Sequence, residues 1–258
     1  ALLIVTFSAS SGMMVPGIAP AHVPALPQAA AGATTAAPAF ADIPLYFVPN
    51  AGQFDGRVAF SAKTSSYTLW ATADELVFDA VWREKTAGGP ASGSEGDGVR
   101  HRPARSPLPV KRDVSRLAFP GRNEAVTILP RAPSGHRINS FLGDDPARWR
   151  EGLETFDAIL YENLYPAVDL KVYGAERAVE YDWVVKPGGE VAAIRFEYRD
   201  VEETKIDEDG NLVVTTAFGD LLHKKPVAYQ MTEGGRTSVN VPAKREISTL
   251  YRLEALPN

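Results

Sequence analysis

The chain has 258 residues and a mass of 27.9 kDa, which allows one large domain or two small ones. With 45% hydrophobic and 23% charged residues it can fill a packed core, and its net charge of −5 argues against nucleic-acid binding, which needs a basic surface. The absence of cysteine excludes a disulfide scaffold, a thiolate metal site and a cysteine nucleophile, and four scattered histidines disfavour a histidine-rich zinc site.

Residues 1–41 contain no Lys, Arg, Asp or Glu, so every charged residue of the chain follows them. The apolar run at residues 2–7 is too short to span a membrane, which takes about 20 residues, and it resembles the end of a signal-peptide core. Ala39-Phe40-Ala41 is typical of a cleavage site before Asp42. These features predict export, with residues 1–41 as a signal-peptide remnant or a disordered or extended Ala/Pro-rich arm.

Two alternatives stay open for this arm. Cleavage can fall earlier in the Ala/Pro tract, which would leave the remainder as an exposed tether. Residues 2–7 can also act as a strand donated to a neighbouring subunit, which would make the chain a subunit of an extracellular fibre.

Residues 42–258 are predicted to form a single β-rich domain, because short runs of alternating apolar and polar residues are separated by Gly, Pro, Asp and Asn. The expected fold class is all-β, an antiparallel sandwich-like module with one short helix near residues 145–152. The expected strands are residues 45–48, 58–62, 67–71, 76–82, 114–119, 125–129, 137–141, 158–161, 168–173, 179–186, 192–198, 211–216, 220–223, 227–231 and 238–241.

Residues 84–113 interrupt this pattern. The segment is rich in Gly and Ser and then becomes basic, with Arg100, Arg102 and Arg105. It is predicted to be a flexible insertion between two strands. Its basic half suits an acidic polysaccharide, although a solvated loop with no fixed partner is the simpler interpretation.

Several strings of residues occur in the order found in one known family. They are residues 47–53 (FVPNAGQ), 139–146 (NSFLGDDP), 164–170 (LYPAVDL), 180–185 (EYDWVV), 209–212 (DGNL) and 225–230 (KPVAYQ). Together they resemble the β-rich domain near the amino end of bacterial secreted proteins that carry SBBP-type β-propeller repeats, a domain of unknown function. The resemblance implies an extracellular or cell-surface module and brings no established catalytic residues. After Gly235 the chain departs from the family's pattern.

The strands at 168–173 and 179–186 suggest a hairpin with a four-residue loop, residues 174–177. Closing it would place Asp169 directly opposite Asp182 and Lys171 opposite Glu180. Alternation along the strands puts the apolar residues of both strands on one face, which is predicted to be core.

Directly opposed carboxylates are unfavourable unless something compensates for them. An arginine such as Arg195 can form an ion-pair network, a calcium ion can lie between Asp169 and Asp182, or one carboxylate can stay protonated as in a catalytic dyad. The structural ion pair is the preferred interpretation. Calcium is the only candidate cofactor, with Asp169 and Asp182 as its candidate ligands.

Two other polar groups have simple structural interpretations. Residues 207–211 (DEDGN) bring oxygens together but lack the spacing of an EF-hand, so a hairpin turn is preferred to a calcium loop. His223 is predicted to be a half-buried packing residue rather than a ligand.

The preferred function is an exported, non-catalytic structural or adhesion module of the cell surface or extracellular space. Its expected partners are other domains or subunits of a surface assembly, and carbohydrate, with no nucleic acid and no transmembrane segment. The alternative from another class is a carbohydrate-active enzyme that uses the face of Asp169, Glu180 and Asp182.

Overall fold

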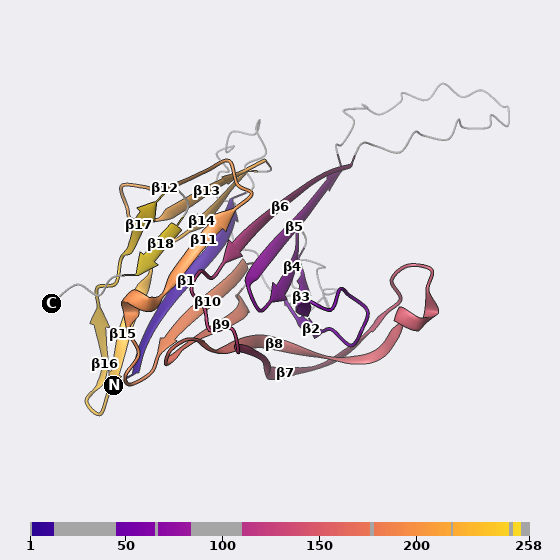
Figure 1. The fold of residues 1–258 in the computed structure, drawn as a ribbon, viewed down its shortest axis with the longest axis horizontal. Helices are drawn as coiled ribbons and strands as arrows, with labels where there is room; N and C mark the ends of the chain where they lie inside the picture. Colours follow the sequence, from indigo (N-terminus) through magenta and orange to yellow (C-terminus); the bar gives the residue numbers. More distant parts are fainter. Residues whose placement is uncertain are drawn as a thin grey trace, which may run out of the picture.

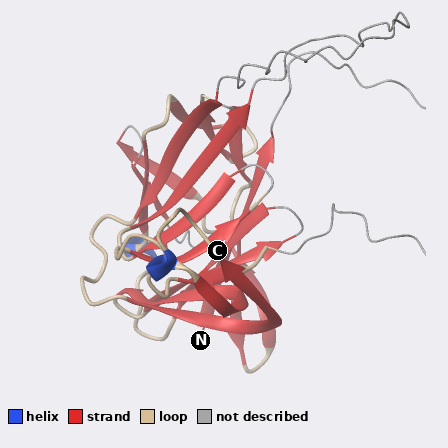
Figure 2. Cartoon of the chain, turned by 90° about the vertical axis from the view of Figure 1, so that its right-hand side faces the viewer, coloured by secondary structure: helices blue, strands red, loops and turns tan. Residues whose placement is uncertain are grey.

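A computed structural model describes residues 2–12, 45–64, 67–83, 110–175, 178–217, 219–247 and 250–253. The greater part of the Ala/Pro arm and of the predicted insertion therefore lies outside the described residues. Nearly all of the regular secondary structure in the described residues is strand, and the helices are short 3-10 turns, which confirms the all-β prediction (Figure 2).

The strands form one continuous antiparallel sheet that folds over into two facing layers (Figure 1). The first layer runs in the order β2 (Phe47–Pro49), β3 (Val58–Lys63), β4 (Tyr67–Thr72), β5 (Glu75–Arg83), β6 (Val110–Ala118), β11 (Arg195–Arg199), β18 (Leu250–Leu253) and β17 (Ala243–Ile247). β2 also pairs with β8 through Phe47 and Phe156, and this pairing joins the two layers at one edge.

The second layer contains the long strands and the amino-terminal strand. Its order is β7 (Thr127–Ser140), β8 (Arg150–Tyr165), β9 (Val168–Ala175), β10 (Ala178–Val185), β1 (Leu2–Gly12), β15 (Val227–Thr232) and β16 (Gly235–Val239). The far half of β1 pairs with β14 (Gly219–His223), which continues through β13 (Leu212–Thr216) to β12 (Glu203–Ile206).

Each strand expected from the alternation overlaps an observed strand, but several boundaries differ. The separate strands expected at 125–129 and 137–141 are parts of the single strand β7, in which Ala132 and Gly135 adopt positive φ angles. The helix expected near 145–152 is one 3-10 turn, η2 (Pro146–Arg148), because β8 begins at Arg150. Asp145 caps this turn by accepting a hydrogen bond from the Ala147 amide at 3.0 Å.

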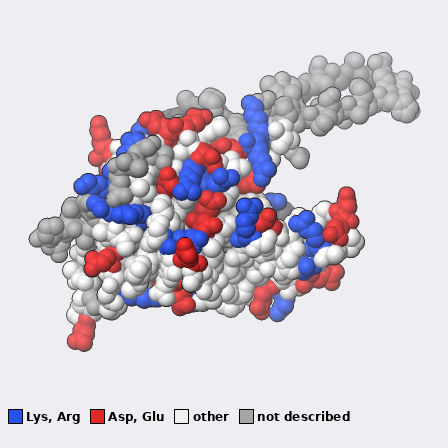
Figure 3. Space-filling model, in the orientation of Figure 1, with Lys and Arg blue, Asp and Glu red and all other residues white. Residues whose placement is uncertain are grey.

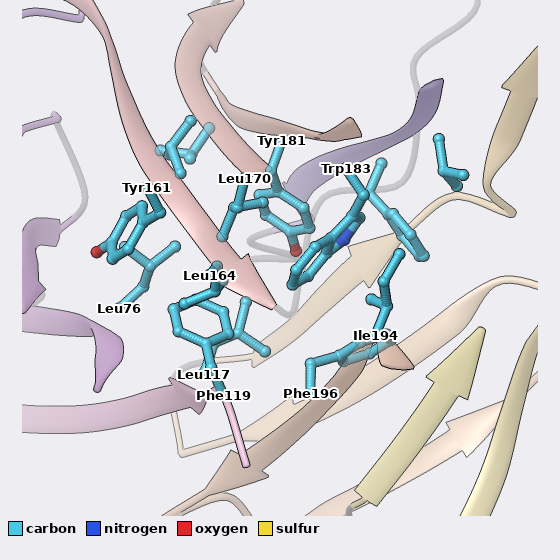
Figure 4. Close-up of a cluster of buried hydrophobic side chains, with 14 of the residues drawn as sticks. Leu76, Leu117, Phe119, Tyr161, Leu164, Leu170, Tyr181, Trp183, Ile194 and Phe196 are labelled. Atoms are coloured by element: carbon cyan, nitrogen blue, oxygen red, sulfur yellow. The ribbon is translucent and has the colours of Figure 1, made fainter. Parts of the chain in front are cut away.

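One hydrophobic core lies between the layers, and large aromatic side chains connect them (Figure 4). Trp183 of β10 is fully buried and packs edge-on against Phe119, which follows β6, at 6.1 Å between ring centroids. Phe7 of β1 makes a similar contact with Phe196 of β11 at 5.7 Å. Because these pairs join strands of opposite layers, the core belongs to the whole sheet and not to either layer alone.

The residues predicted as signal-peptide remnant include β1, a central strand of the second layer. Val5 is 0% and Phe7 2% exposed, and the strand has a paired neighbour on each side, β10 and the β14–β15 segment. The apolar run 2–7 therefore has a structural role in this fold, whatever its role in export. Residues 13–41, with the predicted cleavage site, lie outside the described residues.

Candidate functional site

The predicted hairpin of β9 and β10 forms, but its register is two residues from the one predicted. Asp182 lies opposite Lys171, and Asp169 lies opposite Val184. The prediction of directly opposed carboxylates is therefore wrong, because β9 runs two residues further than expected and the connection to β10 spans only residues 176 and 177. A shift of two preserves which residues share a face, so the predicted core face is confirmed: Val168, Leu170, Val172, Val179, Tyr181, Trp183 and Val185 are all buried.

Asp169 is 6% exposed and is neutralised within the fold. Its Oδ1 lies 2.7 Å from the Lys186 Nζ and accepts a hydrogen bond from the Asn163 amide at 2.8 Å. Asn163 has a φ of 51° at an irregular part of the β8–β9 pairing, so Asp169 stabilises an unfavourable backbone conformation. Lysine, and not the predicted Arg195, supplies the compensating charge.

Asp182 lies on the outer face of the second layer, beside Lys171 and Tyr173. It accepts a hydrogen bond from the Tyr173 hydroxyl at 3.2 Å. The lysine ammonium also lies over the Tyr173 ring, 4.7 Å from its centroid. Among the described residues, no group of three or more His, Asp or Glu side chains is placed to hold a metal ion. Calcium binding stays a prediction, without the opposed pair that suggested it.

His223 is 2% exposed and lies between Tyr181 of β10 and Tyr198 of β11, which come from opposite layers. Its Nδ1 is 2.5 Å from the Tyr181 hydroxyl, and its Nε2 is hydrogen-bonded to the Tyr198 hydroxyl. Burial lowers the pKa of His223 to about 3 and raises the pKa of both tyrosines. The adjoining cavity measures about 10 Å³, which is too small for a ligand. The interpretation of His223 as a packing residue is supported, with burial deeper than predicted.

The two predicted turns are also observed. Asp207 Oδ1 accepts hydrogen bonds from the amides of Asp209 and Asn211, and Gly210 has a φ of 85°, so the 207–211 segment is a hairpin turn between β12 and β13. Gly52 has a φ of 102° in the turn after β2. The side chain of Asn50 closes this turn through hydrogen bonds to Gly52, Asp55 and Val58.

A much larger and more open concavity lies elsewhere, on the outer face of the first layer. It is a groove of about 740 Å³ over β4, β5 and β6, and we call it the arginine–aromatic groove. Two aromatic rings, four arginines and three carboxylates line it: Phe54, Trp70, Arg57, Arg112, Arg116, Arg148, Asp55, Asp74 and Glu75. None of the predicted carboxylates Asp169, Glu180 and Asp182 belongs to it.

The sheet places the groove residues by simple alternation. Trp70 of β4 is paired with Val77 of β5, which is paired with Arg116 of β6, so these side chains form one row on the outer face. Phe54 comes from the turn after β2 and packs edge-on against Trp70 with 5.0 Å between centroids. Arg148 of η2 holds that turn through a hydrogen bond from its guanidinium to the Gln53 carbonyl at 2.9 Å.

Most charged groups of the groove are in ion pairs. Arg112 makes two hydrogen bonds to Asp79, at 2.7 and 2.8 Å, and the Trp70 indole N–H points at the same carboxylate at 3.4 Å. Arg116 lies 2.8 Å from Asp200. Their arginine partners lower the pKa values of Asp55 and Asp79. The wider surface likewise intersperses both signs of charge (Figure 3).

Sequence reasoning missed this groove because its residues come from distant parts of the chain. The alternating signal was present in part, since Trp70, Val77 and Arg116 occupy outward positions of predicted strands, whereas Glu75 and Arg112 lie just before two of them. What the sequence did not show is that β4, β5 and β6 are neighbours and that η2 closes one side.

The described residues contain no helix with the length and apolar character needed to cross a membrane. No curated protein and no solved structure matches the chain. One family model matches residues 47–248, a span that holds all the strings on which the resemblance rested. The association with SBBP-type repeats and with secretion stays a prediction. Since the match covers most of the chain, the protein belongs to the family described as a domain of unknown function, DUF7948.

Proposed function

We propose that the chain is a non-catalytic binding module of an exported surface or extracellular protein, and that it holds a carbohydrate in the arginine–aromatic groove. The observation that carries this proposal is the Phe54–Trp70 pair within a groove of about 740 Å³. This volume lies in the range of small-molecule sites, roughly 300–1,000 Å³. Aromatic rings offer flat apolar surface to the C–H face of a sugar ring, and the surrounding arginines and carboxylates offer donors and acceptors to its hydroxyls.

The state of the carboxylates favours binding over hydrolysis. A glycosidase needs one carboxyl with a raised pKa that donates a proton. Arg57 lowers the pKa of Asp55, and Arg112 lowers the pKa of Asp79, so both groups are ionised at neutral pH. The enzyme alternative built on Asp169, Glu180 and Asp182 has lost the opposed pair of carboxylates on which it depended.

Export remains part of the proposal on the strength of the charge-free residues 1–41. The burial of β1 favours the alternative in which this arm is retained, because cleavage before Asp42 would remove a central strand. The amino-terminal sequence of protein recovered from the producing cells tests this point.

The groove is tested by calorimetric titration of the full chain with neutral and uronic-acid-containing oligosaccharides. We expect at least one of these probes to bind, and Trp70→Ala to weaken its binding at least tenfold. Trp149→Ala is the matched control, because Trp149 is 41% exposed and does not line the groove. We expect no release of reducing ends during the titration.

Three results would contradict the proposal. The first is that none of the oligosaccharides binds. The second is that Trp70→Ala and Trp149→Ala weaken binding equally, which would place the ligand elsewhere. The third is steady release of reducing ends by the wild-type chain, which would favour the enzyme alternative.

A further inference from the structure

β1 completes a sheet whose other strands come from the second half of the chain. Residues 3–8 pair with β10 on one side, residues 2–6 pair with β15 on the other, and residues 9–12 pair with β14. Without β1, β10 and the β14–β15 segment would face each other with unpaired backbone groups. We call this gap the β1 slot.

The slot also has side-chain specificity. Phe7 stacks on Tyr181 of β10 at 5.9 Å between centroids and meets Phe196 of β11 at 5.7 Å. Val5 lies in the same row and is fully buried. A strand that fills the slot must therefore present apolar side chains two residues apart in this register, and the amino-terminal sequence of this chain does so.

The covalent connection does not fix which copy of the chain supplies the strand. β1 ends at Gly12 and β2 begins at Phe47. An extended connection of this length spans on the order of 100 Å. A longer connection lowers the effective concentration of a strand at its own slot, so a strand from a second chain competes more readily as protein concentration rises.

We propose that the β1 slot is an interaction site for β1 of a second copy, so that two or more chains complete one another's sheets by exchanging this strand. The exchanged and the closed forms make the same strand contacts, which is why exchange of an identical element is a route to assembly. The proposal concerns the slot and does not depend on what the groove binds.

The absence of cysteine in the chain allows a direct test. Asp182 of β10 pairs with Thr6 of β1 on one side and with Lys171 of β9 on the other, and all three share the outer face. Two full-length variants, Thr6→Cys and Asp182→Cys, are unfolded together, refolded at a series of concentrations and oxidised. We expect a disulfide-linked heterodimer whose fraction rises with protein concentration.

The matched control mixes Lys171→Cys with the same Asp182→Cys chain. β9 and β10 are joined by two residues and are not exchanged, so this mixture should give no heterodimer beyond the background of each variant alone. Equal cross-linking in both mixtures would overturn the proposal, because it would reflect random collision.

The double variant Thr6→Cys/Asp182→Cys tests the closed form. If it cross-links only within one chain, and the mixture stays monomeric at every concentration, strand exchange does not occur. Ile4→Cys with Val184→Cys, the next outward pair along the strands, repeats the test. Failure of both double variants to cross-link, within or between chains, would show that β1 does not occupy the slot and would also overturn the proposal.

Discussion

His223 shows how a polar residue is accommodated in the core of this protein. A neutral imidazole has one donor and one acceptor nitrogen, and the two tyrosine hydroxyls beside it can serve both. The remaining residues around the adjoining cavity are Phe7, Leu117, Trp183, Phe196 and Leu212, all apolar or aromatic. No charged side chain lines that cavity, so burial alone sets the low pKa of His223.

The low pKa predicts a defined dependence of stability on pH. The pKa of His223 is about 3 in the folded protein and about 6.5 in the unfolded chain. Between these values the unfolded state binds a proton that the folded state does not, so the free energy of unfolding falls as pH falls from 6.5 towards 3. In the His223→Gln variant, we expect the slope of the free energy of unfolding against pH to correspond to about one proton fewer than in the wild type. Urea denaturation between pH 7 and 5 measures this slope.

His136→Gln is the control for this measurement. His136 is exposed, so its replacement controls for the loss of a histidine without disturbing the buried cluster around His223. An identical slope in the wild type and the His223→Gln variant would mean that His223 titrates normally and is not buried as described.

At the scale of individual residues, the sequence predicted the turns better than it predicted the ion-pair partners of charged side chains. Gly52 and Gly210 stand where the chain needs positive φ, and nearby backbone amides complete those turns by donating hydrogen bonds to the side chains of Asn50 and Asp207. The partner of Asp169 was not predictable in this way. Lys186 meets Asp169 because the β9–β10 register brings the end of one strand to the start of the other.

At the scale of the elements, the alternation of apolar and polar residues located most strands. It did not show which strands are central or long, and it left some strands unpredicted. β7 was expected as two strands, 125–129 and 137–141, yet it is one edge strand, where Pro130 and Pro133 are tolerated. β12 was missed because Glu203–Ile206 is short and largely polar. β1 was interpreted as a leader, since an apolar central strand and the core of a signal peptide have the same composition.

The insertion between β5 and β6 gives a prediction for these two strands. They pair continuously from Glu75 opposite Ala118 to Arg83 opposite Val110, so the ends of the connection are already adjacent. Its central residues lie outside the described part of the chain. Deleting residues 88–105 should change the free energy of unfolding by less than about 1 kcal/mol, because closure entropy varies slowly with loop length.

Chemical denaturation of the deletion variant checks this expectation. A truncation of β6 at Val110–Asp113 is the contrasting control, because it removes the Asp79–Arg112 ion pair and part of the ladder. Loss of folding in the deletion variant would show that the connection contributes to the core.

At the scale of the whole molecule, the two layers share a single core. Buried residues from β1 to β18 belong to one cluster, and the aromatic contacts of Phe7, Phe119 and Trp183 cross between layers. The sequence predicted that a layered β fold would form, but the way it closes follows from distant pairings, such as β11 with β6 and β1 with β10. Such pairings join segments far apart in the chain, and a period-2 pattern contains no information about them.

A shared core predicts that a substitution in β1 also destabilises the opposite layer. Phe7→Ala should lower the free energy of unfolding by roughly 3–5 kcal/mol, the usual cost of truncating a buried phenylalanine. Unfolding should remain one transition, with circular dichroism and tryptophan fluorescence coincident, since Trp70 and Trp183 report on different layers. Thr6→Ala, a change on the outer face of the same strand, should have an effect within about 0.5 kcal/mol. Two separated transitions in the Phe7→Ala variant would mean that the layers are stabilised independently and that β1 supports only its own.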